Sequence, residues 1–138
     1  MSENRKLGLN VLIVDDSPDI LFLLRAWLEQ DGFVVSQATS SNEGVKVFQS
    51  VKPDIILSDI SMPAEDGYQF ISRIRNLSDE GNQVPAIALT AYAREEEKNR
   101  AMASGFHLHI SKPTSKAIVL KAVRSLLETS LENKAVSI

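Results

Sequence analysis

Residues Ile55 to Pro63 read Ile-Ile-Leu-Ser-Asp-Ile-Ser-Met-Pro, and the interpretation of the whole chain starts from them. A short apolar run that ends in a carboxylate, with a proline soon after, is typical of a buried strand that stops abruptly. The pattern predicts a strand that brings Asp59 to the edge of a sheet. An aspartate at a strand end often does no more than turn the loop. The role of Asp59 therefore depends on the residues that accompany it elsewhere in the chain.

The composition limits the class of protein. The chain has 138 residues, of which 43% are hydrophobic and 24% are charged, as expected for one globular domain. A formal net charge of -3 argues against a broad surface for nucleic acid or anionic lipid. The lack of cysteine excludes disulfides, thiolate metal sites and cysteine nucleophiles. No apolar run in the sequence is long enough for a membrane span, so we expect a cytoplasmic protein with no membrane or direct nucleic-acid partner.

Four further apolar runs punctuate the chain, and helical patterns separate them. We expect the other strands at Asn10–Val14, Phe33–Ala38, Pro85–Leu89 and Phe106–Ile110. We expect helices to begin near Ser17, Ser41, Asp66, Arg94 and Ser115. In the helix after Arg94, the most charged of the five, Met102 is expected to pack inward. Strands that alternate with helices predict a parallel sheet between two helical layers, a three-layer α/β sandwich.

Side chains capable of chemistry follow four of the five predicted strands. They are Asp15 and Asp16 after the first strand, Asp59 after the third, Thr90 after the fourth and Lys112 after the fifth. The carboxyl ends of parallel strands share one edge of a sheet, and ligands of such folds bind there. Three carboxylates held close together repel one another, so they should bind a cation or carry raised pKa values. Oxygen ligands without histidine or cysteine favour Mg²⁺ or Mn²⁺ over Zn²⁺.

The same edge suggests phosphoryl chemistry. A hydroxyl at Thr90 and an ammonium at Lys112, opposite a metal ion, would frame the oxygens of a phosphoryl group. One carboxylate could then accept that group and form an acyl phosphate. Asp59 is the preferred nucleophile because it stands alone at the end of the central strand, whereas Asp15 and Asp16 form a pair suited to the metal.

Four motifs together resemble the receiver domain of two-component response regulators. They are Asp15-Asp16-Ser-Pro, Asp59 within Ser-Asp-Ile-Ser-Met-Pro, Thr90-Ala91 and Lys112-Pro113, in this order and each after its predicted strand. The resemblance covers about Asn10 to Leu127. It implies a flavodoxin-like (βα)5 fold with a five-stranded parallel sheet in the order 2-1-3-4-5. We expect the receiver domain at 9–130, flexible ends at 1–8 and 131–138, and no output domain.

The resemblance implies how the acidic residues divide their roles. Asp59 would accept a phosphoryl group from a histidine kinase or a phosphotransfer protein. Asp16, Asp59 and the backbone carbonyl of Ser61 would hold Mg²⁺, or alternatively Mn²⁺, and Asp15 would act through water. Ser61 would also influence how easily water attacks the phosphorylated Asp59.

Further family positions follow the fourth and fifth predicted strands. Thr90, Lys112 and the backbone N–H of Ala91 would bind the phosphoryl oxygens. Tyr92 would share with Ser61 the tuning of dephosphorylation. The peptide bond between Lys112 and Pro113 would be the cis bond of the family, a conformation that costs little before proline.

Position 109 departs from the family pattern. Receivers usually carry Tyr or Phe there. The resemblance implies that phosphorylation pulls Thr90 inward and that the side chain at position 109 follows it. This movement would reshape the face made by the fourth helix, fifth strand and fifth helix. This chain has His109, whose charge can change near neutral pH. Two interpretations of His109 are open: it acts as the switch residue, or it is an exposed strand residue without a role in switching. His107 is expected to have a structural role.

The favoured function is a signalling switch that acts through protein contact and whose own chemistry is limited to self-phosphorylation and slow self-dephosphorylation. A receiver module of a hybrid histidine kinase or a phosphorelay is the main alternative. A metal-dependent phosphatase is disfavoured because such enzymes have Asp-x-Asp after the first strand, where this chain has Asp15-Asp16-Ser17. A flavin carrier is disfavoured because the acidic loop would repel a phosphate, and an inactive receiver because every required residue is present. The kinase, the downstream protein and dimerisation on phosphorylation are left open.

Overall fold

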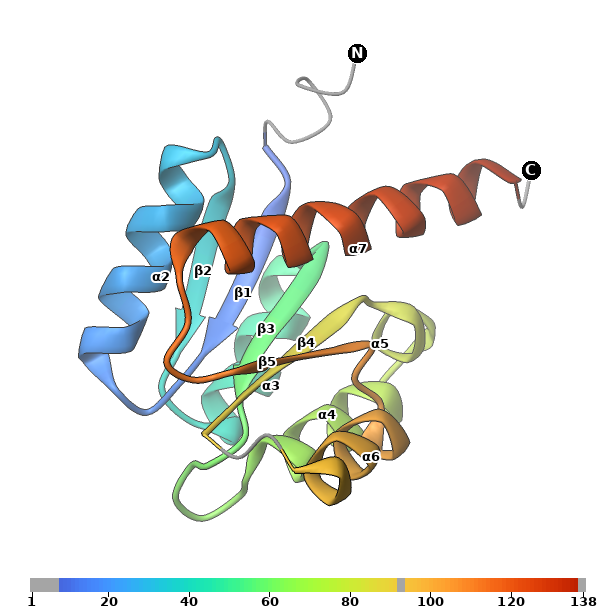
Figure 1. The fold of residues 1–138 in the computed structure, drawn as a ribbon. Helices are drawn as coiled ribbons and strands as arrows, with labels where there is room; N and C mark the ends of the chain where they lie inside the picture. Colours follow the sequence, from blue (N-terminus) through green and yellow to red (C-terminus); the bar gives the residue numbers. More distant parts are fainter. Residues whose placement is uncertain (1–7, 92–93, 137–138) are drawn as a thin grey trace.

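A computed structural model describes residues 8–91 and 94–136, with the side chains of residues 132–136 excepted (Figure 1). Its strands are β1 (Asn10–Val14), β2 (Val34–Ala38), β3 (Ile55–Asp59), β4 (Ala86–Thr90) and β5 (Leu108–Ser111). Its helices are α2 (Pro18–Gln30), α3 (Ser41–Val51), α4 (Gly67–Arg75), α5 (Asp79–Gln83), α6 (Glu95–Ser104) and α7 (Lys116–Val136). The strands pair in parallel in the order β2-β1-β3-β4-β5. The predicted flavodoxin-like fold is therefore confirmed.

The sheet separates two apolar cores. Along β1, Val11 and Ile13 face the core beneath α2 and α7, while Leu12 and Val14 face the core beneath α3, α4 and α6. This alternation follows from the pleat of a strand, whose successive side chains point to opposite faces. Every residue of β3 and β4 is buried. Burial on both faces explains why these strands read as unbroken apolar runs.

Polar side chains cap the first turns of three helices, close to the positions at which the sequence predicts these helices to begin. The hydroxyl of Ser17 accepts the N–H of Ile20, and Pro18 is the first residue of α2. The helix α3 begins at Ser41, with Ser40 as its capping residue. Asp66 caps α4 through a reciprocal pair of hydrogen bonds with Gln69. These caps set the direction in which each helix leaves the carboxyl edge of the sheet.

The short helix α5 was not predicted, so the described residues contain six helices rather than five. Its five residues are too few to show a helical period in the sequence. Arg75, at the end of α4, donates to the carbonyl oxygens of Gly81 and Val84 at 2.9 and 2.6 Å and to that of Gly105 at 2.7 Å. One guanidinium therefore holds α5, the approach to β4 and the turn before β5 together.

Two helices differ from expectation in detail. In α6 only Ala101 is buried, and Met102 is 51% exposed, so the prediction that Met102 packs inward was wrong. The helix α7 continues to Val136 through residues that were expected to belong to a flexible end. Its second half extends past the sheet (Figure 1). Among the described residues, no helix combines the length and the apolar character needed to cross a bilayer.

Candidate functional site

The carboxyl ends of the strands bring the predicted site residues to one edge of the sheet. Asp15 and Asp16 follow β1, Asp59 ends β3 and Thr90 ends β4. Because β3 lies between β1 and β4, Asp59 is central in this group. One carboxylate oxygen from each of Asp15, Asp16 and Asp59 lies within 4.8 Å of the others. The three aspartates thus form the cluster that the strand ends predicted.

Lys112 supplies the positive charge in the cluster. Its Nζ donates to Asp15 Oδ2 at 3.1 Å and to Asp59 Oδ1 at 3.0 Å. Asp15 and Asp59 are 1% and 4% exposed, whereas Asp16 is exposed to solvent. One ammonium group is therefore shared by two buried carboxylates, so one negative charge is left over, and the third carboxylate is accessible from solvent.

The charges shift the pKa values of both central groups. Burial raises the pKa of Asp59, the hydrogen bond from Lys112 lowers it, and the charge of Asp15 raises it again, with a net rise. Burial alone would lower the pKa of Lys112, but the hydrogen bond to Asp59 and the charges of Asp15 and Asp59 outweigh burial and raise it. The pKa of Asp59 thus rises mainly because the carboxyl group is buried, and the pKa of Lys112 rises because two carboxylates surround it. The buried site holds more negative than positive charge. Such a site gains stability from a further cation.

Backbone groups orient the two buried carboxylates. The N–H of Ser17 donates to Asp15 Oδ1 at 2.9 Å, and the N–H of Ser61 lies 3.4 Å from Asp59 Oδ1. Gly67, the first residue of α4, comes so close that a Cβ there would lie 2.4 Å from the carbonyl oxygen of Asp59. Sequence reasoning missed this glycine, whose only signal was its place directly after the capping Asp66.

The phosphoryl-binding candidates lie beside Asp59. Thr90 is 2% exposed, and its carbonyl oxygen accepts the N–H of Lys112 at 2.7 Å. Ala91 is exposed. The bond between Lys112 and Pro113 is cis. Tyr92, which was expected to tune dephosphorylation, lies outside the described residues.

The two histidines have different surroundings. His109 is half-buried on β5 opposite Ala88, and its Nε2 is shielded from solvent without a hydrogen-bond partner among the described residues. His107 lies just before β5, and its Nδ1 accepts the N–H of Ala86 at 3.2 Å. Burial lowers the pKa of His107, and the nearby charge of Arg75 adds to the effect. His107 thus has the structural contact that was expected of it, while the role of His109 stays a prediction.

The donor set fits a hard divalent cation. Within the described part of the chain, Asp15, Asp16 and Asp59 can each offer one oxygen, and no histidine or cysteine belongs to the cluster. Mg²⁺ prefers carboxylate and carbonyl oxygens and retains several waters. The exposure of Asp16 leaves a path for such an ion from solvent.

The fold and this cluster define a known class of protein. The family model of the response regulator receiver domain matches residues 11–124, and the chain belongs to this family. It is therefore a signalling domain of the two-component type.

Three similar proteins match this chain over most of its length and most of their own. The "Uncharacterized 14.6 kDa protein in sodA1 3'region" of Leptolyngbya boryana is 40% identical over 116 residues, which are 84% of this chain and 88% of that protein. The structure of chemotaxis protein CheY4 from Vibrio cholerae superposes with a TM-score of 0.83 at 28% identity, covering 86% of this chain and 98% of that one. The receiver domain of a Pseudomonas aeruginosa sensor histidine kinase superposes with a TM-score of 0.80 at 27% identity, covering 88% and 98%, and holds a magnesium ion in its active site cleft.

Proposed function

We propose that the chain is a phosphorylation-controlled switch in which Asp59 accepts a phosphoryl group from a histidine of a kinase or a phosphotransfer protein. One observation carries the proposal. Asp59 is a buried carboxylate at the end of the central strand, with an ammonium group at 3.0 Å and two more carboxylates within 4.8 Å. This arrangement offers a nucleophile, a counter-charge and a metal site at one point.

The transfer step follows from these neighbours. A carboxylate oxygen of Asp59 forms a bond to phosphorus while the nitrogen–phosphorus bond of the donor histidine breaks, which gives an acyl phosphate. The ammonium group of Lys112 donates a hydrogen bond to Asp59 and would then bind an oxygen of the transferred phosphoryl group. Thr90, at the end of the neighbouring strand, and the backbone N–H of Ala91 would bind the remaining phosphoryl oxygens.

The acidic cluster would hold the metal ion that this step requires. Asp16, Asp59 and the backbone carbonyl of Ser61 would bind Mg²⁺, with Asp15 acting through water and Mn²⁺ as the alternative ion. When bound, the ion would neutralise charge on the phosphoryl oxygens. The exposed Asp16 supports this assignment because it can reach an ion without giving up a bond to Lys112.

The output would be a change of surface that a partner protein recognises. We assign to the chain no reaction on another substrate, only its own phosphorylation and slow dephosphorylation, which Ser61 and Tyr92 would tune. His109 would follow Thr90 as the switch residue. The alternative is that the chain serves as the receiver module of a hybrid histidine kinase or a phosphorelay. Dimerisation on phosphorylation is one form that the change of surface could take. We place this activity in the cytoplasm, where ATP is available to phosphorylate the kinase.

Intact mass spectrometry after incubation with acetyl phosphate tests the proposal. The wild type should gain one phosphoryl group only when Mg²⁺ is present, and Asp59→Asn should gain none. Asp19→Asn is the matched control, because Asp19 is an exposed carboxylate at the start of α2 outside the cluster. An unmodified wild type, or a modified Asp59→Asn, would overturn the assignment of Asp59.

A further inference from the structure

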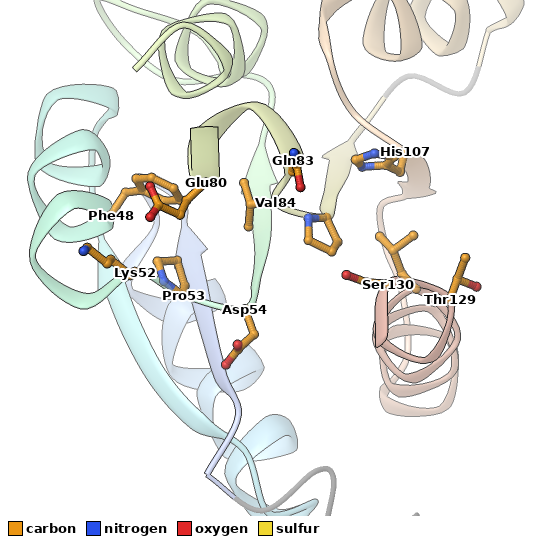
Figure 2. Close-up of a pocket in the computed structure, with 12 residues that line it drawn as sticks. Phe48, Lys52, Pro53, Asp54, Glu80, Gln83, Val84, His107, Thr129 and Ser130 are labelled. Carbon is orange, nitrogen blue, oxygen red and sulfur yellow. The ribbon is translucent and has the colours of Figure 1, made fainter. Parts of the chain in front are cut away.

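A pocket of about 500 Å³ lies at the edge of the sheet opposite to Asp59 (Figure 2). Its walls come from the end of α3, the residues that lead into β3, β4 and β5, the short helix α5 and the second half of α7. The strands β3 and β4 start beside this pocket and end at Asp59 and Thr90. A strand of five residues spans about 17 Å, so a molecule in this pocket would not touch the phosphoacceptor site.

The size and floor of the pocket suit a small organic molecule. Small-molecule sites usually measure about 300–1,000 Å³ and are lined mainly by apolar side chains. The apolar part of this lining consists of Phe48, Pro53, Val84, Pro85 and Leu126. All but Leu126 are buried in the fold, so the floor is formed by fixed side chains.

Two unpaired charges of opposite sign stand at one end of the pocket. Figure 2 shows Lys52 and Glu80 close to Phe48, on the side of α3 and α5. Neither side chain has a hydrogen bond or an ion pair with any other described residue. A ligand with one charge would be attracted by one of these groups and repelled by the other. A ligand that carries both charges would satisfy both.

The opposite end of the pocket is polar but uncharged. His107 stands there, across the pocket from Lys52 (Figure 2). Because its Nδ1 accepts the N–H of Ala86, the neutral ring carries its proton on Nε2 and can donate it. Ser130 of α7 adds a hydroxyl to the lining. Asp54 adds a second carboxylate to the lining of the pocket. Its Oδ2 accepts the N–H of Asn10 at 2.7 Å, and its remaining negative charge favours the ammonium group of a ligand.

We propose that this pocket binds a small zwitterion with an apolar body, of the chemical class of an amino acid with an aromatic or branched side chain. The carboxylate of the ligand lies toward Lys52, its ammonium group toward Glu80, and its apolar body over the floor beside Val84. The site is separate from the phosphoacceptor, so its test does not depend on the function proposed for Asp59.

Nitrogen–proton correlation NMR with L-phenylalanine as the probe tests the proposal. Saturable shifts are expected at the backbone amides of Lys52, Asp54, Val84, His107 and Ser130. Phenethylamine lacks the carboxylate, 3-phenylpropanoate lacks the ammonium group, and glycine lacks the apolar body. Each of these should bind at least tenfold more weakly than L-phenylalanine, since each loses one of the matched interactions.

Variants of the lining separate this pocket from other surfaces. Thr129→Trp fills the pocket from an exposed helical position and should abolish the shifts, whereas Glu128→Trp, outside the lining on α7, should not. Lys52→Asn, which suits the left-handed backbone at φ 52°, should weaken binding at least tenfold, whereas Lys46→Asn on α3 should not.

Three results would overturn the proposal. The first is the absence of saturable shifts with L-phenylalanine in the wild type. The second is equal binding of the single-charge analogues, which would remove the role of the paired charges. The third is a shift of the same amides when protein concentration is raised without a ligand, which would show that a second copy of the chain covers the pocket.

Discussion

Replacing Lys112 with alanine should destabilise the metal-free protein by about 2–3 kcal/mol at pH 7.5. The substitution leaves Asp15 and Asp59 buried without their common counter-charge. Two carboxylates 4.8 Å apart repel by about 3.5 kcal/mol at an effective dielectric constant of 20, and in the wild type the ammonium group offsets this repulsion. Protonation of one carboxylate limits this cost, so the deficit should shrink as the pH falls toward 5.

Magnesium should reverse most of this loss. An ion that binds the folded state stabilises it according to its concentration relative to the dissociation constant, by about 2.7 kcal/mol at a hundredfold excess. In Lys112→Ala the ion no longer competes with the ammonium group for Asp15 and Asp59. The variant should therefore gain more stability from Mg²⁺ than the wild type does.

Urea unfolding with and without about 10 mM MgCl₂ measures both effects, because a large excess of the ion saturates the metal site. Lys116→Ala is the control, because Lys116 is an exposed lysine whose Nζ bonds to Gln30 and lies outside the acidic cluster. The reasoning would be refuted if Lys112→Ala were as stable as the wild type without metal. It would also be refuted if both proteins gained equally from Mg²⁺.

Three further predictions concern the same fold. Burial raises the pKa of Asp59, so the stability from this group is present below its ordinary pKa of 3.8 and is lost as the pH rises through the raised value. Asp59→Asn should therefore be more stable than the wild type at pH 7, by about 1 kcal/mol, and this advantage should vanish at acid pH in urea titrations. Gly67→Ala should slow phosphorylation by acetyl phosphate at least tenfold, because its Cβ would push the Asp59 carbonyl; an unchanged rate would contradict this. Arg75→Ala should cost about 2–4 kcal/mol in urea unfolding, because three backbone carbonyls lose their donor; Arg75→Lys should recover only part.

The strands and the aspartate cluster were predictable because their signals are local. Asp59 follows an apolar run that the fold buries on both faces, and a parallel sheet brings such strand ends together. Ser17 and Pro18 mark the start of α2 by side-chain and backbone chemistry that acts within a few residues. Local patterns of this kind were enough to predict a parallel sheet between helical layers and the acidic cluster, whereas the strand order was predicted from the resemblance to receiver domains.

The missed features depend on contacts between distant segments. The helix α5 is too short for a period, and Arg75 stabilises it from the end of another helix. The closeness of Gly67 to Asp59 appears only once α4 packs on the end of β3. Met102 lies on a helix that buries a single residue, so an apolar side chain there was no guide to packing. The pocket beside His107 draws its lining from segments spread along most of the chain.

Locating the phosphoryl group tests the central claim most directly. The protein would be treated with acetyl phosphate and Mg²⁺, reduced with borohydride, which converts an aspartyl phosphate to homoserine, and mapped by peptide mass spectrometry. The account predicts homoserine at position 59 and unmodified aspartate at positions 15 and 16, with no conversion when Mg²⁺ is left out. Homoserine at position 15 or 16, or none at position 59, would contradict it.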